Sequence, residues 1–321
     1  MSGRRFADVR IDSSLSLSEL EVGGESGSRE RVSIREAGQV LFPQDPFDHR
    51  HEWLDPTGTV TLFGARVGDA HFLKMPGVGE FRLHERNGID AWREPEATAD
   101  SLRHALLDQV LPRWLAHCGR LMLHGGAVVI DDDRCIVMIG DSGRGKSTLS
   151  AALARDGARL LTDDCVLLDV DGQDARALAT YPGLRLLPDS LQALYGEQIP
   201  QSTPVAHYTA KRRVVHADDG VAAPVTVGAV VILQAPPSDE AVRIEPMPSA
   251  AACMELVRNA FQLDMGDMAR ASAQLARAAE VVRRVPVFTL SYPRRYDILS
   301  EVVARLRALL ATPSSGAGAG A

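Results

Sequence analysis

The sequence predicts an α/β protein in which a phosphate-loop domain follows a small β-rich N-terminal domain. Residues 1–96 hold short runs of alternating apolar and polar residues, separated by turn residues. Residues 97–311 instead alternate apolar runs with helical patterns. Within them, Gly140 to Ser147 fits the pattern G-x-x-x-x-G-K-[ST]. The Gly-, Ser- and Ala-rich residues 312–321 are expected to form a flexible tail.

The composition is typical of a soluble globular protein. Of the 321 residues, 45% are hydrophobic and 24% are charged, and the formal net charge is -7. This acidic balance argues against nucleic acid as a partner. We see no apolar stretch long enough to span a membrane, so no membrane partner is expected. The four cysteines are far apart and form no C-x-x-C pair, which favours reduced thiols and a cytoplasmic location.

The N-terminal region reads as short strands joined by turns. Its clearest runs are Arg31–Ile34, Thr59–Phe63 and His71–Lys74, and residues Asp55–Gly58 form a typical turn. The segment DPFDHRHE, which ends at Glu52, gathers carboxylates and histidines that could hold a metal. We interpret it as a polar, solvated loop.

A long helix is predicted to follow this region and to pack the two halves of the chain together. It begins at Thr98, with Thr98 or Asp100 as the N-cap, and ends at Gly119. Pro112 should kink it, because proline removes a backbone donor inside a helix.

The glycine-rich segment lies between a predicted strand, Cys135–Ile139, and a predicted helix, Lys146–Asp156. The strand should pair in a hairpin with the apolar run that precedes it, Leu121–Ile130. Glycines let successive backbone N–H groups turn toward a phosphate, and the helix N-terminus adds partial positive charge. Lys146 should reach the β- and γ-phosphates, and the Ser147 hydroxyl should ligate Mg²⁺. The predicted phosphate-binding residues are Gly140, Asp141, Ser142, Gly143, Arg144, Gly145, Lys146, Ser147 and Thr148.

Two adjacent carboxylates, Asp163 and Asp164, interrupt the next apolar run, Arg159–Leu168. Carboxylates are costly in an otherwise apolar strand, and a metal–phosphate site beside the loop would compensate them. Successive residues of a strand face opposite ways. Either the backbone bends at this pair or the two carboxylates have separate roles.

The remaining chain reads as further strands and helices around this centre. Thr180–Pro188 is predicted as strand and turn, Asp189 starts a short helix, and Glu197–Tyr208 is predicted as a mobile loop. Lys211, Arg212 and Arg213 form a tight basic cluster, either a clamp for phosphate or acceptor or a solvated strand end. Asp218–Gly220 reads as a hairpin turn. Predicted strands follow at 225–233, 242–245 and 286–292, and helices at 249–264, 267–284 and 295–310.

The order His124-Gly125, then GDSGRGKS, a helix and L-L-T-D-D resembles the catalytic domain of the HPr kinase/phosphorylase family. A weaker likeness continues through YPGLRLLPDSL, AKRRVV and PVFTLSYPR. The resemblance implies a fold similar to phosphoenolpyruvate carboxykinase. It also implies ATP and Mg²⁺ as cofactors, and a hexameric family makes a homo-oligomer an expectation.

The resemblance also implies roles for individual residues. Asp163 would be the base toward an acceptor serine, while Asp164 and His124 would assist at the metal and the phosphates, together with Lys146. Ser147 and Asp164 would therefore hold the metal. We do not find the glycine-rich signature of the bifunctional enzymes downstream of the acidic pair, which argues against phosphorylase activity. Because the N-terminal region does not resemble theirs, HPr is not the expected acceptor.

The sequence and the resemblance together predict a kinase that phosphorylates serine on a protein or peptide. Related kinases found with lasso-peptide biosynthesis act on a serine of the peptide precursor, which makes such a precursor a candidate partner. Two alternatives stay open: a regulatory module that binds ATP without catalysis, and a small-molecule kinase. No base-recognition motif decides between ATP, GTP and pyrophosphate.

Overall fold

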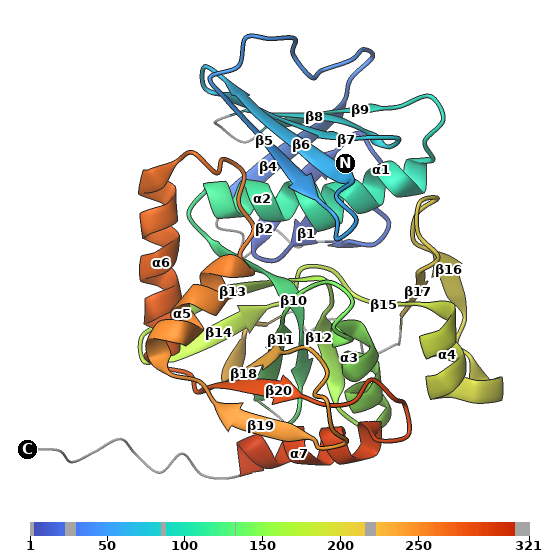
Figure 1. Cartoon of the computed structure of the whole chain (residues 1–321). Helices are drawn as coiled ribbons and strands as arrows, with labels where there is room; N and C mark the ends of the chain where they lie inside the picture. The colour runs from blue at the N-terminus through green and yellow to red at the C-terminus, as the bar shows by residue number, and fades with distance from the viewer. Residues whose placement is uncertain (1–2, 23–29, 85–87, 132, 216–222, 312–321) are drawn as a thin grey trace, which may run out of the picture.

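The computed structural model describes residues 3–22, 30–84, 88–131, 133–215 and 223–311. It shows a mixed α/β protein with several β-sheets (Figure 1). The predicted turn at 218–220 and the predicted tail at 312–321 lie outside these residues. No helix of the described residues is long and apolar enough to cross a membrane.

The first sheet contains the strands of the N-terminal region. Their order is β3-β1-β2-β4-β9-β8-β7-β6-β5. The strands are β1 (Arg4–Phe6), β2 (Val9–Ser13), β3 (Glu21–Val22), β4 (Glu30–Glu36), β5 (His49–Leu54), β6 (Val60–Val67), β7 (Ala70–Met75), β8 (Gly79–His84) and β9 (Gly88–Arg93). The three predicted runs lie in or overlap β4, β6 and β7, so they are confirmed as strands. The segment DPFDHRHE, predicted as a loop, instead ends in edge strand β5.

The predicted long helix lies between the two larger sheets (Figure 1). It is made of α1 (Ala99–Ala105), the π-helical segment η1 (Leu106–Val110) and α2 (Leu111–His117). The Thr98 side chain caps it by accepting a hydrogen bond from the Ser101 N–H. The π-helical segment η1 ends just before α2, so Pro112 lies in the first turn of α2. The missing N–H of a proline costs little at that position. One hydrophobic cluster joins the first sheet, this helix and Met122 and Cys165 of the second sheet.

The second sheet carries the predicted hairpin. Its order is β11-β10-β13-β14-β18-β20-β19, with β12 beside β10. Because β11 also pairs with β18, the strands β10, β11, β13, β14 and β18 close into a ring. The strands are β10 (Leu121–Val129), β11 (Arg134–Ile139), β12 (Arg159–Thr162), β13 (Cys165–Asp171), β14 (Asp174–Leu178), β18 (Val225–Leu233), β19 (Arg243–Pro246) and β20 (Val287–Ser291).

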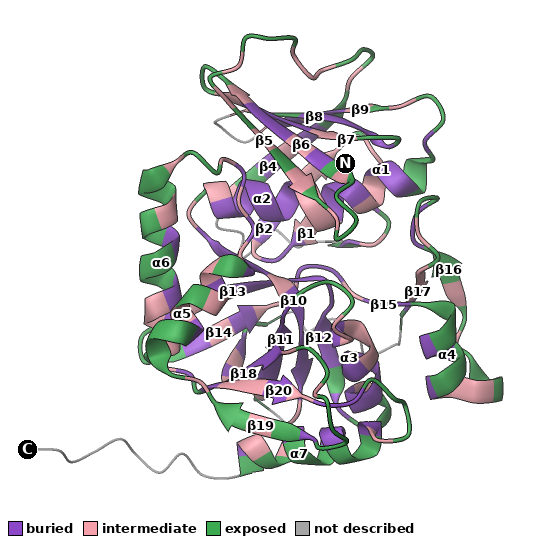
Figure 2. Cartoon of the chain, viewed as in Figure 1, coloured by how far each residue is buried: buried purple, intermediate pink, exposed green. Residues whose placement is uncertain are grey.

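Helices cover both faces of this sheet, and their apolar sides are buried against it (Figure 2). Helices α3 (Lys146–Arg155) and α7 (Leu299–Ala311) share one hydrophobic cluster with the sheet. Helices α5 (Ser249–Arg258) and α6 (Met268–Val282) share another. The predicted helix 249–264 is shorter than expected, because the chain after Asn259 forms an isolated bridge from Ala260 to Leu123.

A small third sheet and a short helix stand beside the glycine-rich loop. The sheet order is β15-β17-β16, with β15 (Leu184–Leu186), β16 (Ser202–Pro204) and β17 (Arg212–Val214). Helix α4 (Pro188–Tyr195) and a 3-10 turn, η2 (Gly196–Gln198), connect β15 to β16. The prediction of an irregular loop over 197–208 was therefore wrong in part, since β16 lies inside it. Its three residues pair with β17, a partner that local sequence does not reveal.

Candidate active site

The glycine-rich loop joins the end of β11 to the start of α3, as the sequence predicts. Gly145 has a φ of +89° and Gly140 has a φ of +141°. A Cβ on Gly140 would lie 2.8 Å from the Leu233 carbonyl oxygen, and one on Gly145 would lie 3.1 Å from the Tyr292 hydroxyl. Glycine is therefore needed at both positions, both for the backbone conformation and for the close packing of β18 and Tyr292.

Lys146, the first residue of α3, turns its side chain back into the loop. Its ammonium donates to the carbonyl oxygens of Gly140 at 2.6 Å and Asp141 at 3.0 Å. Burial lowers the pKa of Lys146 to about 8, although the charges of Asp164 and Asp163 act in the opposite direction. The ammonium thus lies within the loop, at the place where the prediction requires a cation for phosphate.

The strand that carries the two carboxylates is broken between β12 and β13. Asp164 has a φ of +62°, which ends the regular alternation of side chains. Its carbonyl accepts a hydrogen bond from the Gly125 N–H of β10 at 3.0 Å, so the bend is held by the neighbouring strand. Of the two predicted alternatives, the backbone does bend.

The two carboxylates also have different partners. Asp163 Oδ1 accepts from the Ser147 hydroxyl at 3.0 Å, and its Oδ2 accepts from the Arg185 backbone N–H at 2.9 Å. Asp164 instead pairs with cationic side chains, Arg185 Nε at 3.4 Å and Lys211 Nζ at 3.7 Å. The prediction placed Ser147 with Asp164 at the metal, whereas in this structure the hydroxyl of Ser147 is bonded to Asp163.

These surroundings separate the pKa values of the pair. Burial, and next the charge of Asp164, raise the pKa of Asp163 to about 6. Burial also acts to raise the pKa of Asp164, but the charges of Lys211 and Arg185 outweigh it and lower that pKa to about 2. Two adjacent carboxyl groups thus differ in basicity, which is the usual preparation for two different chemical roles.

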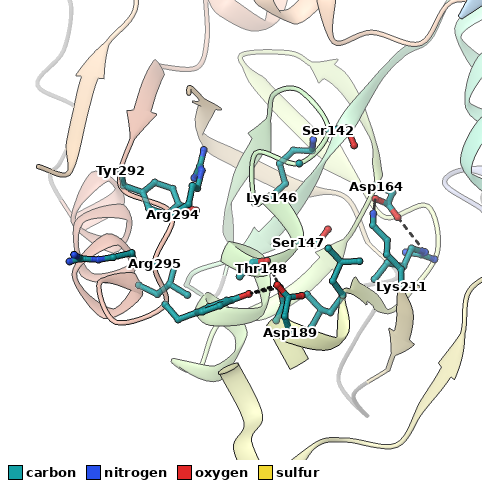
Figure 3. A pocket seen from close by; sticks show the side chains of 18 of the residues that line it. Ser142, Lys146, Ser147, Thr148, Asp164, Asp189, Lys211, Tyr292, Arg294 and Arg295 are labelled. Atoms are coloured by element: carbon teal, nitrogen blue, oxygen red, sulfur yellow. Dashed lines mark hydrogen bonds and ion pairs between the residues drawn. The ribbon is translucent and has the colours of Figure 1, made fainter. Parts of the chain in front are cut away.

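A cavity of about 390 Å³ opens beside the loop. It is lined by His124, Ser142, Gly143, Gly145, Lys146, Ser147, Thr148, Asp164, Arg185, Leu186, Leu187, Asp189, Ser190, Lys211, Tyr292, Arg294, Arg295, Tyr296 and Leu299. Figure 3 shows Asp164 and Lys211 at one end, Tyr292, Arg294 and Arg295 at the other, and Lys146, Ser147 and Thr148 between them.

Most of the predicted site residues meet in this cavity. Three loop residues do not line it: Gly140, Asp141 and Arg144. Asp141 binds Arg258 of α5 at 2.7 Å through Oδ1 and Arg144 at 3.2 Å through Oδ2, so its carboxylate supports the outside of the loop. Asp163 lies behind Ser147 and is almost fully buried, with 1% of its surface exposed.

The three residues of the predicted basic clamp, Lys211, Arg212 and Arg213, have different surroundings in the structure. Lys211 precedes β17 and lines the cavity. Arg212 instead binds Ser202 of β16, with 2.8 Å from its Nε to the hydroxyl oxygen. Arg213 points to the opposite face and donates to the Pro182 carbonyl at 3.2 Å. Of the three cations, Lys211 lines the cavity, whereas Arg212 and Arg213 bind Ser202 and the Pro182 carbonyl, so the three do not form one clamp.

His124 lies on β10 and lines the cavity. Its backbone N–H donates to the Asn259 carbonyl at 2.8 Å, and its ring meets the edge of Phe261 at a centroid distance of 6.1 Å. Burial, and next the charge of Lys146, lower the pKa of His124. Both effects disfavour the protonated form of the ring.

Sequence reasoning missed Arg185. Its guanidinium is 1% exposed, stacks over the Tyr181 ring at 4.0 Å and lines the cavity. Among the described residues, its Nη2 has no hydrogen-bond partner, while its Nε lies 3.4 Å from Asp164 Oδ2. Buried N–H groups that lack an acceptor beside a glycine loop suit phosphoryl oxygens. An arginine inside the apolar run Leu184–Leu187 was the signal that could have identified it.

The far end of the cavity was missed as well. It is formed by Asp189, Ser190, Tyr292, Arg294, Arg295 and Tyr296. The two tyrosines and two arginines around Pro293, directly after the last strand, were a usable signal, because aromatic and cationic residues rarely gather without a ligand or interface.

One feature of the site fits Mg²⁺. The Ser147 hydroxyl contacts the carboxylate of Asp163 beside the loop, and both groups offer oxygen ligands. Among the described residues, no group of three or more histidine, cysteine, aspartate or glutamate side chains could hold a metal ion alone. Mg²⁺ bound to a nucleotide needs no such group, because phosphate oxygens and water supply most of its ligands.

Among solved structures, the chain is similar to the Hpr(Ser) kinase/phosphatase from Coxiella burnetii. The two share 16% sequence identity with a TM-score of 0.29, and the match covers 59% of this chain and 96% of that chain. No model of a known protein family matches the chain, and no curated protein matches it. The function is therefore argued from the site itself.

Proposed function

We propose that this protein is an ATP- and Mg²⁺-dependent kinase that transfers a phosphoryl group to a serine hydroxyl of a protein or peptide. The observation that supports this most is the contact between the loop residue Ser147, which lines the cavity, and the carboxylate of Asp163 behind it, with the adjacent Asp164 lining the cavity. A module that merely bound a nucleotide would need the loop but not a pair of buried carboxylates with separated pKa values.

Lys146, Arg185 and Lys211 supply the positive charge that phosphoryl transfer requires. All three line one cavity; Lys146 and Arg185 are buried, so their charges are weakly screened, whereas the Lys211 side chain is 36% exposed. Mg²⁺ bound with the nucleotide would neutralise further negative charge on the phosphate oxygens. Lys211 and Arg185 also keep Asp164 ionised, which fits it for binding a cation rather than for accepting a proton.

Asp163 has the properties of the base. With a pKa of about 6 it is ionised at neutral pH, yet it is a stronger base than an ordinary aspartate. Its Oδ1 is bonded to the Ser147 hydroxyl in this structure. If the Ser147 hydroxyl held Mg²⁺ instead, Oδ1 would be free to accept the proton of the acceptor serine as the new O–P bond forms. The bond from phosphorus to the leaving ADP oxygen breaks in the same step.

The acceptor peptide could bind by adding a strand to the first sheet. In the described part of the chain, β5 pairs with β6 alone, so its other edge can receive a strand. Removing the N-terminal region would not test this cleanly, because its core continues into α1, α2 and Met122. Hydrogen exchange on the full chain should instead show protection of the β5 amides by a bound peptide. Unchanged exchange there would exclude this mode of binding.

The proposed activity is tested with γ-labelled ATP and Mg²⁺, offered with HPr, a panel of serine peptides, and small molecules that carry hydroxyl groups. We expect label on a serine peptide and none with Asp163→Asn, which should still bind ATP. Label on a small molecule alone would favour the small-molecule kinase. ATP binding without transfer to any acceptor would favour the regulatory module.

A further inference from the structure

The cavity extends well beyond the phosphate loop, toward the start of α4 and the segment before α7. This end is formed by residues from two distant parts of the sequence. We name Leu187, Asp189, Ser190 and Tyr296 the distal slot. None of the roles proposed above uses these four residues.

The orientation of a triphosphate on this loop is set by the loop itself. The Ser147–Asp163 contact and Lys211 mark the end where the terminal phosphate must lie for transfer. Thr148 points the other way, with 3.1 Å between its hydroxyl and that of Ser190. Whatever is attached to the phosphates on the non-reacting side must therefore leave the loop through the distal slot.

The distal slot is unsuited to a phosphate but suited to an uncharged, flat group. Asp189 would repel a phosphate. Of the two arginines at this end of the cavity, Arg295 is paired with Glu240 at 2.8 Å, and Arg294 donates to the Gln234 carbonyl at 2.8 Å and lies over the Tyr292 ring. Leu187 and Tyr296 line the slot although 45% and 40% of their surfaces are exposed. An apolar side chain and an aromatic ring left in a solvent-accessible cavity are typical of a site that stacks a planar ligand.

The ring of Tyr296 is fixed in place before any ligand binds. Its hydroxyl donates to Asp189 Oδ2 at 3.1 Å and lies 3.2 Å from the Ser190 hydroxyl. A fixed ring loses little conformational entropy when a base stacks on it. The carboxylate of Asp189 keeps a second oxygen that can accept a hydrogen bond from a sugar hydroxyl.

We infer that the distal slot binds the base and ribose of a nucleoside triphosphate, so that the phosphoryl donor is a nucleotide and not pyrophosphate or another inorganic polyphosphate. This inference rests on the proposed function, which already takes ATP as the donor, and it adds the residues that hold the base and ribose and the reason why pyrophosphate is not used. Stacking on an aromatic ring tolerates any base, so the slot favours nucleotides as a class.

Calorimetric titration of the full chain with ATP and, separately, with inorganic tripolyphosphate tests the inference. The wild type should bind ATP at least tenfold more tightly than tripolyphosphate. Tyr296→Ala should weaken ATP binding about tenfold and leave tripolyphosphate binding within about twofold. Leu187→Ser should act in the same direction, and Tyr296→Phe, which keeps the ring, should retain most of the affinity.

Tyr208→Ala is the matched control, because Tyr208 is equally exposed at 42% but does not line the cavity. It should leave both affinities unchanged. If Tyr296→Ala and Leu187→Ser both leave ATP binding unchanged, or if they weaken tripolyphosphate equally, the inference is overturned. A failure of the proposed phosphate loop would give a different result. In that case Lys146→Met would leave the binding of both ATP and tripolyphosphate unchanged.

Discussion

Replacing Asp163 with asparagine should make the protein more stable and inactive at the same time. The buried carboxylate accepts one hydrogen bond from the Ser147 hydroxyl and one from the Arg185 N–H. An asparagine can keep both contacts, because its carbonyl can accept from Arg185 and its amino group can donate to the Ser147 oxygen. The substitution thus removes a charge without removing the hydrogen bonds.

The size of the gain follows from the pKa of Asp163. Burial and the charge of Asp164 raise that pKa from 3.8 to about 6 in the folded protein. Between these two pH values the folded state binds more protons than the unfolded state, so the free energy of unfolding falls as pH rises. Above pH 6 the ionised Asp163 lowers the free energy of unfolding by roughly 3 kcal/mol, which is the upper limit of what Asp163→Asn can recover.

Urea unfolding in the presence of a chelator measures this gain. We expect Asp163→Asn to be more stable than the wild type at pH 8 by roughly 1–3 kcal/mol, with about a third of that gain remaining at pH 4.5. Asp133→Asn, at a carboxylate that is 83% exposed, is the control and should change stability by less than about 0.5 kcal/mol. A destabilised Asp163→Asn protein, or a gain that does not depend on pH, would refute the reasoning.

Three further predictions concern transfer and nucleotide binding. Because the pKa of Asp163 is about 6, the rate of transfer should fall about tenfold per pH unit below that value and level off above it; a rate that is flat from pH 5 to 8 would argue against Asp163 as the base. Lys211→Met should slow transfer by roughly 10- to 100-fold, whereas Arg212→Met, outside the cavity, should keep most of the activity. Gly145→Ala should weaken ATP binding and lower the free energy of unfolding by roughly 1–2 kcal/mol, because φ is +89° and a Cβ would lie 3.1 Å from the Tyr292 hydroxyl, which would have to shift; calorimetry and urea unfolding that both show no change would contradict this prediction.

The parts of the site that are local in sequence could be predicted from it. The glycine loop, the strand before it and the helix after it are specified by adjacent residues, and the structure places them together. The bend at Asp164 was one of two alternatives, because alternation along a regular strand cannot present two adjacent carboxylates to one ligand. Its cause, the hydrogen bond from Gly125, comes from another strand.

The parts of the site that depend on chain pairing could not be predicted. Whether Lys211 or Arg212 faces the cavity depends on where β17 begins, and this is fixed by pairing with β15 and β16. In the sequence, Arg185 is a single basic residue in an apolar run. Its contacts with Asp164 and Tyr181 exist only in the folded chain. The irregular η1 turn likewise has no local signature.

The most direct test of the account is a crystal structure with a non-hydrolysable ATP analogue and Mg²⁺. The account predicts the terminal phosphate beside Ser147, Asp163 and Lys211, with the base stacked on Tyr296. A nucleotide bound in the reverse direction, with its base beside Asp163, or bound away from the glycine loop altogether, would contradict it.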